Sequence, residues 1–355
     1  MMEIYQKVVK LLKEGHRFVL ATVIVQQGPS PRGIGTKCLI LDDGSLVGTI
    51  GGGALEARTM DEARAVLEKG LPSRLYFSLT GTDVAETDML CGGEVEVFLE
   101  PVSREATNSV EVFKKAADVL GRGGAGLLAT IVDREYCSRG ECRRAFFSGQ
   151  GESVGSLSDG GDLESELKKK VKTFLDSGRP LMSPLTAGSG NPVEVFVEPL
   201  YSAPVLYVFG GGHVSLQIVP LAARVGFETI VIDDRADFAD KTRFPDAADV
   251  RCLQFEGLLE GLPIDNTSYL VIVTRGHIHD KLVLEQALKT DARYIGMIGS
   301  GRKRRVIYDR LLEEGFEKSD LERVYSPIGL EIGADTPEEI AVSIVAELIK
   351  VRAGV

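Results

Sequence analysis

The stretch Leu206–Arg235, LYVFGGGHVSLQIVPLAARVGFETIVIDDR, decides the fold of the second part of the chain. An apolar run ends at a triple glycine (210–212), apolar residues recur at helical spacing over 213–224, and a β-branched run ends in two aspartates. This is the order of a βαβ unit, whose glycines let the backbone approach a pyrophosphate at the helix N-terminus. Asp233 follows Gly210 by 23 residues, close to the roughly 20 that place a carboxylate on a ribose. The stretch predicts a Rossmann-like domain with a doubly wound parallel sheet.

Ser215 stands where the third glycine of the dinucleotide pattern is expected. Serine is small enough for the helix to pack closely on the strand, so the fold prediction holds, but a fold does not fix its ligand. One hypothesis is therefore an NAD(P)-dependent oxidoreductase that uses Asp233 for the ribose. Against it, the sequence shows no catalytic acid–base pair beside the nicotinamide position.

The composition of the 355-residue chain is that of a soluble protein with two or three domains. Hydrophobic residues make up 44% and charged residues 26%, and no apolar run approaches the roughly 20 residues of a membrane-spanning helix. The first seventeen residues predict an amphipathic helix without a secretory signal. The net charge of −11 argues against a general nucleic-acid binder. We expect a cytoplasmic protein without stable membrane anchoring.

The five cysteines form no dense framework. The one close pair, Cys137 and Cys142, has four residues between its members, and no second pair follows. This spacing argues against structural zinc and favours reduced thiols. Cys91 precedes a diglycine, whose free N–H groups could lower the pKa of its thiol. It is a candidate nucleophile or soft metal ligand, the alternative being a buried, inert cysteine.

The first part of the chain contains two copies of one pattern. Three pairs of similar segments follow one order: FVLATVI (18–24) and GLLATIV (126–132), LVGTI (46–50) and SVGSL (153–157), VEVFLEP (95–101) and VEVFVEP (193–199). Such a series predicts an internal duplication. We expect an N-terminal α+β domain made of a first repeat (1–101) and a degenerate second repeat (102–200), followed by the Rossmann-like domain (201–355).

The two copies differ where chemistry could take place. The triple glycine at 51–53 corresponds to Ser-Asp-Gly at 158–160, and Cys-Gly-Gly at 91–93 corresponds to Ser-Gly-Asn at 189–191. Glycines that served turns alone should have been retained in both copies. The first repeat is therefore predicted to carry function; the alternative is that both repeats are scaffold.

Four polar segments follow strands of the predicted parallel sheet, at the edge where ligands bind in such folds. They are residues 210–213, 233–234, 275–280 and 299–302. His213, at a helix N-terminus, could act as a neutral donor or a metal ligand, or only cap the turn. His277 and His279 are expected in a loop before a helix over 281–288. The basic run 302–305 could hold phosphate or form a solvated helix face.

Eight motifs, distributed from one end of the chain to the other, resemble the XdhC/CoxI family of accessory proteins for xanthine dehydrogenase and related molybdenum hydroxylases. They are GPSPRGIG (28–35), GTIGGGALEAR (48–58), LCGGEVEVFLEP (90–101), FGGGHVSLQIVPLAARVGF (209–227), VIDDR (231–235), VTRGHIHD (273–280), YIGMIGSGRKR (294–304) and PIGLEIGADTPEEIAVSIVAEL (327–348). The segment of roughly 102–190 carries none of them. Ala54 departs from the family, which often has Cys after the triple glycine, and this leaves Cys91 as the sole candidate thiol.

The resemblance implies a maturation chaperone without turnover of its own. Such a protein binds molybdenum cofactor, as molybdopterin or its nucleotide, protects it during sulfuration and delivers it to an apo molybdenum hydroxylase of the xanthine dehydrogenase type. A cysteine desulfurase as partner and a homodimer are also implied. The competing hypotheses are the NAD(P)-dependent oxidoreductase and a structural partner with a vestigial pocket. The candidate cofactor-binding residues are Arg32, Gly51, Gly52, Gly53, Glu56, Cys91, Gly92, Gly93, Gly210, Gly211, Gly212, His213, Asp233, Asp234, His277, Gly299, Ser300 and Arg302, with Cys91 also the candidate metal ligand.

Overall fold

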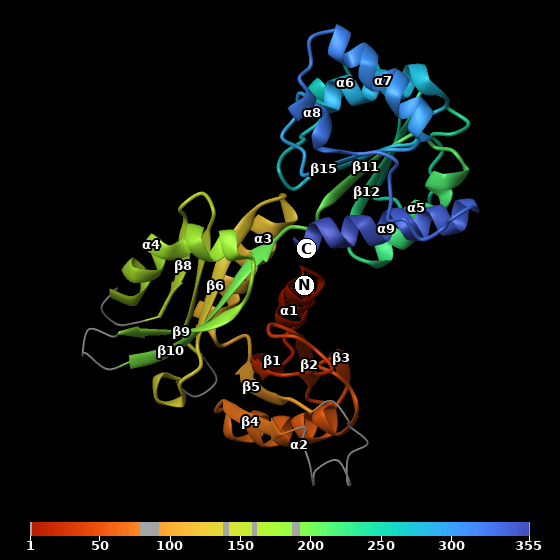
Figure 1. The fold of residues 1–355 in the computed structure, drawn as a ribbon. Coiled ribbons are helices and arrows are strands. Elements are labelled where there is room, and N and C mark those ends of the chain that lie inside the picture. The colour runs from red at the N-terminus through yellow and green to blue at the C-terminus, as the bar shows by residue number, and fades with distance from the viewer. Residues whose placement is uncertain (1, 79–91, 138–141, 158–161, 187–191, 355) are drawn as a thin grey trace. The chain divides into compact units, whose positions relative to one another are not determined.

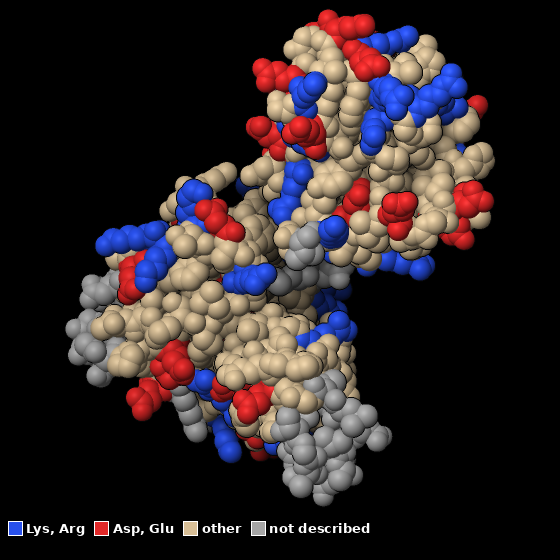
Figure 2. All heavy atoms as spheres, in the orientation of Figure 1, with Lys and Arg blue, Asp and Glu red and all other residues tan. Residues whose placement is uncertain are grey.

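The computed structural model describes residues 2–78, 92–137, 142–157, 162–186 and 192–354. The chain forms two compact units, unit 1 (Met1–Ser202) and unit 2 (Ala203–Val355) (Figure 1). Acidic and basic side chains are interspersed on the visible face of each unit (Figure 2). Among the described residues, no helix is both long and apolar enough to cross a membrane.

Unit 1 contains the same order of elements twice: a helix, three strands, a helix and two strands. The first repeat comprises α1 (Met2–Glu14), β1 (Phe18–Gln27), β2 (Lys37–Leu41), β3 (Leu46–Gly48), α2 (Gly53–Lys69), β4 (Ser73–Ser78) and β5 (Glu94–Val102). The second comprises α3 (Thr107–Gly121), β6 (Ala125–Ile131), β7 (Arg144–Ser148), β8 (Ser153–Ser156), α4 (Asp162–Ser177), β9 (Leu181–Thr186) and β10 (Pro192–Tyr201), with the short 3-10 helix η2 (Arg134–Tyr136) after β6. The antiparallel sheets have the equivalent orders β3-β2-β1-β5-β4 and β8-β7-β6-β10-β9. The predicted internal duplication is confirmed.

Both faces of the first sheet are buried, which explains why the β1 sequence is apolar at nearly every position. Val19 and Val23 pack with α2 in a core of the first repeat, while α4 covers the second sheet in the same way. Phe18 and Leu20 point to the opposite face, into a third core that contains residues of both α1 and α3. Because side chains alternate along a strand, two cores can share one strand. The first helix of each repeat therefore packs against that of the other.

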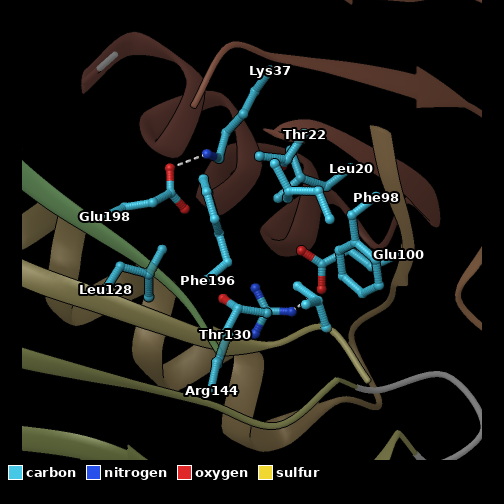
Figure 3. A pocket seen from close by; sticks show the side chains of 12 residues that line it. Leu20, Thr22, Lys37, Phe98, Glu100, Leu128, Thr130, Arg144, Phe196 and Glu198 are labelled. Carbon is cyan, nitrogen blue, oxygen red and sulfur yellow. Dashed lines mark hydrogen bonds and ion pairs between the residues drawn. The ribbon is translucent and has the colours of Figure 1, made fainter. Parts of the chain in front are cut away.

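A seam of buried charges joins the two repeats, and its members are related by the duplication (Figure 3). Lys37 on β2 forms an ion pair with Glu198 on β10, and Arg144 on β7 forms an ion pair with Glu100 on β5. Each pair thus links one repeat to the other. The cavity between them has a volume of about 10 Å³, room for roughly one water molecule. The two ion pairs therefore cross between the repeats, and the cavity beside them has no room for a ligand larger than water.

Unit 2 has the parallel sheet that the sequence predicted, and the sheet consists of six strands. The strands are β11 (Val205–Phe209), β12 (Glu228–Asp233), β13 (Asp249–Cys252), β14 (Tyr269–Ile272), β15 (Tyr294–Met297) and β16 (Val324–Tyr325). Their order, β13-β12-β11-β14-β15-β16, is the doubly wound Rossmann order, which reverses direction between β11 and β14. Its core on one face includes α5 (His213–Arg224) and α9 (Pro337–Ala353), and on the other α6 (His277–Ala287) and α7 (Gly301–Glu313). The 3-10 helix η3 (Leu258–Gly261) and α8 (Lys318–Glu322) complete the unit. The predicted fold class is confirmed.

One predicted boundary is wrong. The helix expected over 281–288 begins at His277, four residues earlier. Gly276 takes a left-handed φ of 83° before it, and Asp280 in the first turn accepts a hydrogen bond from the backbone N–H of Thr274 (3.1 Å). His277 and His279 therefore lie on the first turn of α6 and not in a loop. Two residues apart on a helix, they point to different sides.

Candidate functional site

Three glycine segments of the first repeat converge in unit 1. A Cβ atom on Gly93 would lie 2.4 Å from the carbonyl oxygen of Pro29, and one on Gly51 would lie 2.8 Å from the Cβ atom of Pro31. The loop that carries GPSPRGIG is thus in close contact with both the triple-glycine turn and the start of β5. Such approaches are possible only where no side chain intervenes, which is a reason for glycine at these two positions. The convergence brings three sequence motifs to one place.

The triple-glycine turn already holds a carboxylate of the chain itself. Glu56, in the first turn of α2, accepts hydrogen bonds from the backbone N–H groups of Ile50 (3.1 Å) and Gly52 (3.0 Å) and from the hydroxyl of Thr49. Burial opposes ionisation of Glu56, but these hydrogen bonds outweigh it and lower the pKa of the carboxyl group. The second repeat has an equivalent, since Glu164 accepts from the N–H of Leu157 (2.6 Å). Glu56 thus acts as a cap of its own turn, and a phosphate there would have to displace it.

Arg32 lies in the loop between the two other glycine segments. Its side chain is exposed, and among the residues that the structure describes it forms no ion pair and no side-chain hydrogen bond. No atom of the described residues lies within 4 Å of a Cβ atom built on Gly52 or Gly92. Cys91 lies outside the described residues. The described part of this site therefore offers an exposed guanidinium and accessible backbone, close to the engaged carboxylate of Glu56.

In unit 2 the four predicted segments meet at the carboxyl ends of the strands. The backbone N–H of Gly211 donates to Asp233 (2.7 Å), and Arg275 donates to Asp234 (2.7 Å). Asp280 forms an ion pair with Lys303, the residue that directly follows the fourth segment (299–302). The first three segments are thus joined to one another by hydrogen bonds, and the third is also paired with the residue after the fourth. Parallel topology brings strand ends to one edge, as the sequence predicted.

Asp233 has its carboxylate directed into the protein and is only 1% exposed. Besides the N–H of Gly211 it accepts two hydrogen bonds from the guanidinium of Arg235, each of 2.9 Å. Burial raises the pKa of Asp233, but these donors outweigh burial and hold the pKa below its ordinary value. In dinucleotide-binding enzymes the carboxylate at this position contacts a ribose. Here the carboxylate of Asp233, at the end of β12, instead binds the glycine turn through the N–H of Gly211. Ser215 is fully buried and donates to the carbonyl of Gly210, which explains a serine at the third glycine position.

Replacing Asp233 by Asn is expected to lower the free energy of unfolding by about 2 kcal/mol at pH 7, because charge-assisted hydrogen bonds contribute roughly 1.5–3 kcal/mol. A lowered pKa stabilises the fold above the unfolded-state pKa of about 3.9, and this stabilisation is lost as pH falls through the folded-state value. The difference between wild type and variant should therefore shrink below about pH 4. Urea unfolding from pH 3 to 8 measures it. Asp309→Asn, at an exposed position, is the control, and an equal effect from both would contradict the prediction.

The glycine turn of unit 2 is covered on one side by residues 235–243. Arg243 donates to the carbonyl oxygens of Gly211 (2.8 Å) and Phe238 (3.1 Å). The ring of Phe238 contacts the guanidinium of Arg235, 3.5 Å from its centroid, as well as that of Arg243. No described atom lies within 4 Å of a Cβ atom built on Gly212, the side chain of His213 is exposed, and α5 has no side-chain cap. An anion could therefore reach the N-terminus of α5 from the uncovered side.

A second group of polar residues lies at the N-terminal ends of α6 and α7. Asp280 is fully buried; burial raises the pKa of its carboxyl group, while Lys303 and Thr274 oppose that rise. His277 and Arg302 are exposed. Ser300 accepts from the N–H of Lys303 (3.3 Å) and caps α7, whereas Gly299 lies against the Lys303 side chain.

Sequence reasoning did not single out Thr274, Phe238 or Arg243, and it considered Lys303 only as part of the basic run 302–305. Asp280 and Lys303 carry opposite charges and follow neighbouring strands, and this was the signal in the sequence that Lys303 could pair with Asp280. Phe238 and Arg243 lie in a stretch without regular periodicity, which gave no signal. Among the described residues, no group of three or more His, Cys, Asp or Glu side chains is arranged to hold a metal ion.

The chain matches two family models and is similar to several known proteins. Residues 206–348 match the model of the XdhC Rossmann domain, and residues 11–78 match that of the XdhC and CoxI family. A protein of Bacillus subtilis, named as a probable subunit of xanthine dehydrogenase, is 26% identical over 96% of this chain and 95% of its own length. The molybdenum cofactor insertion chaperone PaoD of Escherichia coli is 21% identical over 97% of this chain and 86% of its own length.

A solved structure, described as a xanthine dehydrogenase from Bacillus halodurans, has the same fold. Its TM-score is 0.79 at 27% identity, over 99% of this chain and 96% of that one. The two family matches lie one in the first repeat and one in unit 2, which are the parts that carry the motifs. The chain therefore belongs to the XdhC and CoxI family.

Proposed function

We propose that this protein binds molybdenum cofactor, protects it during sulfuration and delivers it to a molybdenum hydroxylase of the xanthine dehydrogenase type. Support comes from the family and from the names of two relatives, a probable subunit of xanthine dehydrogenase and a molybdenum cofactor insertion chaperone. These names support a role in the maturation of molybdenum enzymes. The protein would act by binding and release, without turnover of its own.

The convergence of the three glycine segments, one of which is the loop that carries Arg32, is the observation that carries the proposal. The cofactor is an anion with a phosphate and a flat pterin ring; when bound it supplies the molybdenum centre that the recipient enzyme uses. A guanidinium that has no partner among the described residues suits a phosphate, because Arg forms bidentate hydrogen bonds with it. Among the described residues, nothing fills the space beside the backbone of Gly52 and Gly92, where a ring would lie close to the chain. The donor set therefore fits the ligand.

Delivery needs partners as well as a ligand. We propose an apo molybdenum hydroxylase as recipient, a cysteine desulfurase as the source of sulfur, a homodimer as the working form and the cytoplasm as the compartment. Cys91 remains the proposed thiol near the metal. NAD(P) is the competing ligand for unit 2, favoured by the Rossmann order and the uncapped α5, but the carboxylate of Asp233 is engaged within the protein. Stoichiometric NAD(H) binding that is lost in Asp233→Ala would support this competitor.

The proposal is tested by purification from a host that makes the cofactor in excess, with pterin fluorescence and molybdenum analysis. The wild type is expected to retain pterin and metal. Arg32→Ala should lower the retained cofactor roughly tenfold or more, since a charge-assisted hydrogen bond contributes about 1.5–3 kcal/mol. Arg122→Ala, at a side chain that is 78% exposed on the end of α3, should retain as much as wild type. Repeated absence of pterin from the wild type would overturn the proposal.

A further inference from the structure

Two cysteines of the second repeat lie in contact. Cys137 follows η2, and Cys142 lies two residues before the start of β7. Their Sγ atoms are 3.2 Å apart. Cys142 is fully buried, whereas Cys137 is half-buried. The pair thus consists of one thiol with access to solvent and one without.

The separation suits a disulfide better than a metal. A disulfide brings two sulfur atoms to about 2.05 Å, a shift of little more than 1 Å from the observed contact. Two thiolates on one tetrahedral zinc ion, each with a bond of about 2.3 Å, would stand roughly 3.8 Å apart. The described residues also provide no third metal ligand in a suitable group. Oxidation is therefore the chemistry that this geometry favours.

The surroundings assign different roles to the two thiols. Burial and the hydrogen bond with Cys137 raise the pKa of Cys142 well above its ordinary value, so that this thiol does not meet an oxidant as a thiolate. Cys137 lies 3.5 Å from the carbonyl oxygen of Asp133, where its thiol can donate a weak hydrogen bond. Oxidants react first with the more accessible thiol of such a pair, and the neighbouring thiol resolves the product.

We propose that Cys137 and Cys142 form a redox-sensitive dithiol that closes to an intramolecular disulfide with a small disulfide such as oxidised glutathione. The Cys137 thiolate attacks one sulfur of the oxidant, the oxidant's S–S bond breaks, and one glutathione leaves as thiolate. The Cys142 sulfur then attacks the mixed disulfide, and its proton passes to the second departing glutathione. The protein dithiol is oxidised to one S–S bond, and the oxidant is reduced to two thiols.

The position of the pair gives the bond a structural consequence. Cys142 belongs to a small apolar cluster with Phe98 of the first repeat and Phe196 of the second. Arg144, two residues further on, forms the buried ion pair with Glu100. A bond between Cys137 and Cys142 would therefore tie the end of η2 to the edge of the seam between the repeats. Cytosolic disulfides of this kind are transient and serve redox sensing.

The test is made on the full wild-type chain in native buffer. The protein is incubated with oxidised glutathione, its free thiols are blocked, and it is denatured and digested with trypsin without reductant. Trypsin separates the two cysteines into EYCSR (135–139) and GECR (140–143). The expected product is these two peptides joined, two hydrogens lighter than their sum, and separated again by dithiothreitol.

The other described cysteines provide internal controls. Cys38 is buried, and burial raises the pKa of its thiol to about 12, so it should stay reduced. Cys252 is exposed and should end as a mixed disulfide with glutathione. Cys142→Ser should leave the same mixed disulfide on Cys137, and Cys137→Ser should leave Cys142 reduced. The proposal is overturned if the joined peptide is absent at an oxidant level that modifies Cys252.

Discussion

Replacing Glu100 by Gln is expected to lower the free energy of unfolding by about 3–5 kcal/mol, the usual cost of breaking a buried ion pair. The side chains of Arg144 and Glu100 are 1% and 4% exposed. Without the carboxylate, the guanidinium remains charged at a buried position, beside a cavity with room for only about one water molecule. For a unit of this size such a loss corresponds to a fall of roughly 10 °C in Tm. Differential scanning calorimetry of the full chain measures it.

Two further variants separate the ion pair from general effects of a lost charge. Asp61→Asn breaks the pair between Asp61 and Arg64, whose side chains are 73% and 72% exposed, and should change stability by less than about 1 kcal/mol. The double variant Glu100→Leu with Arg144→Met removes both charges and should recover most of the loss, because an apolar pair needs no compensation. If Glu100→Gln is no more destabilising than Asp61→Asn, the seam does not hold the repeats together.

The seam could be predicted only in part. The recurrence of VEVFLEP and VEVFVEP placed Glu100 and Glu198 at equivalent positions. Their partners gave no signal, because Lys37 and Arg144 begin strands, where a single charge usually faces solvent. Sequence also could not show that α1 and α3 pack together and bring the two sheets into contact. The pairing depends on how the repeats pack, which local patterns do not encode.

The candidate site, too, could be predicted from the sequence only in part. Convergence of the strand-end segments in unit 2 follows from parallel topology alone, and the sequence predicted it. Parallel topology does not determine which hydrogen-bond partner each donor and acceptor at these strand ends takes. Asp233 and Glu56 were assigned to a ligand because of their motif positions, yet both carboxylates accept hydrogen bonds from backbone within their own unit. α6 begins at His277, within the expected loop, where the backbone N–H of Thr274 donates a hydrogen bond to Asp280 in the first turn of the helix. Their roles toward a ligand remain predictions.

Replacing Gly93 by Ala is expected to cost about 1–3 kcal/mol of stability and to abolish cofactor retention. The added Cβ would lie 2.4 Å from the carbonyl oxygen of Pro29 and 2.5 Å from that of Gln27. Backbone atoms cannot swing aside as a side chain can, so the loop that carries Arg32 must move away from β5. The three glycine segments would no longer converge. Retained pterin and the melting temperature of the purified variant are the two measurements.

Gly33 provides the matched control, because it lies in the same loop without the same constraint. Among the described residues, a Cβ atom there would meet only the Gln26 side chain, at 3.9 Å, and Gly33 does not adopt a left-handed φ. Gly33→Ala should therefore match wild type in both measurements. If Gly93→Ala loses stability but retains pterin at the wild-type level, the clash is real and the cofactor lies elsewhere. Loss of pterin in both variants would instead show that the loop itself, and not its contact with β5, limits binding.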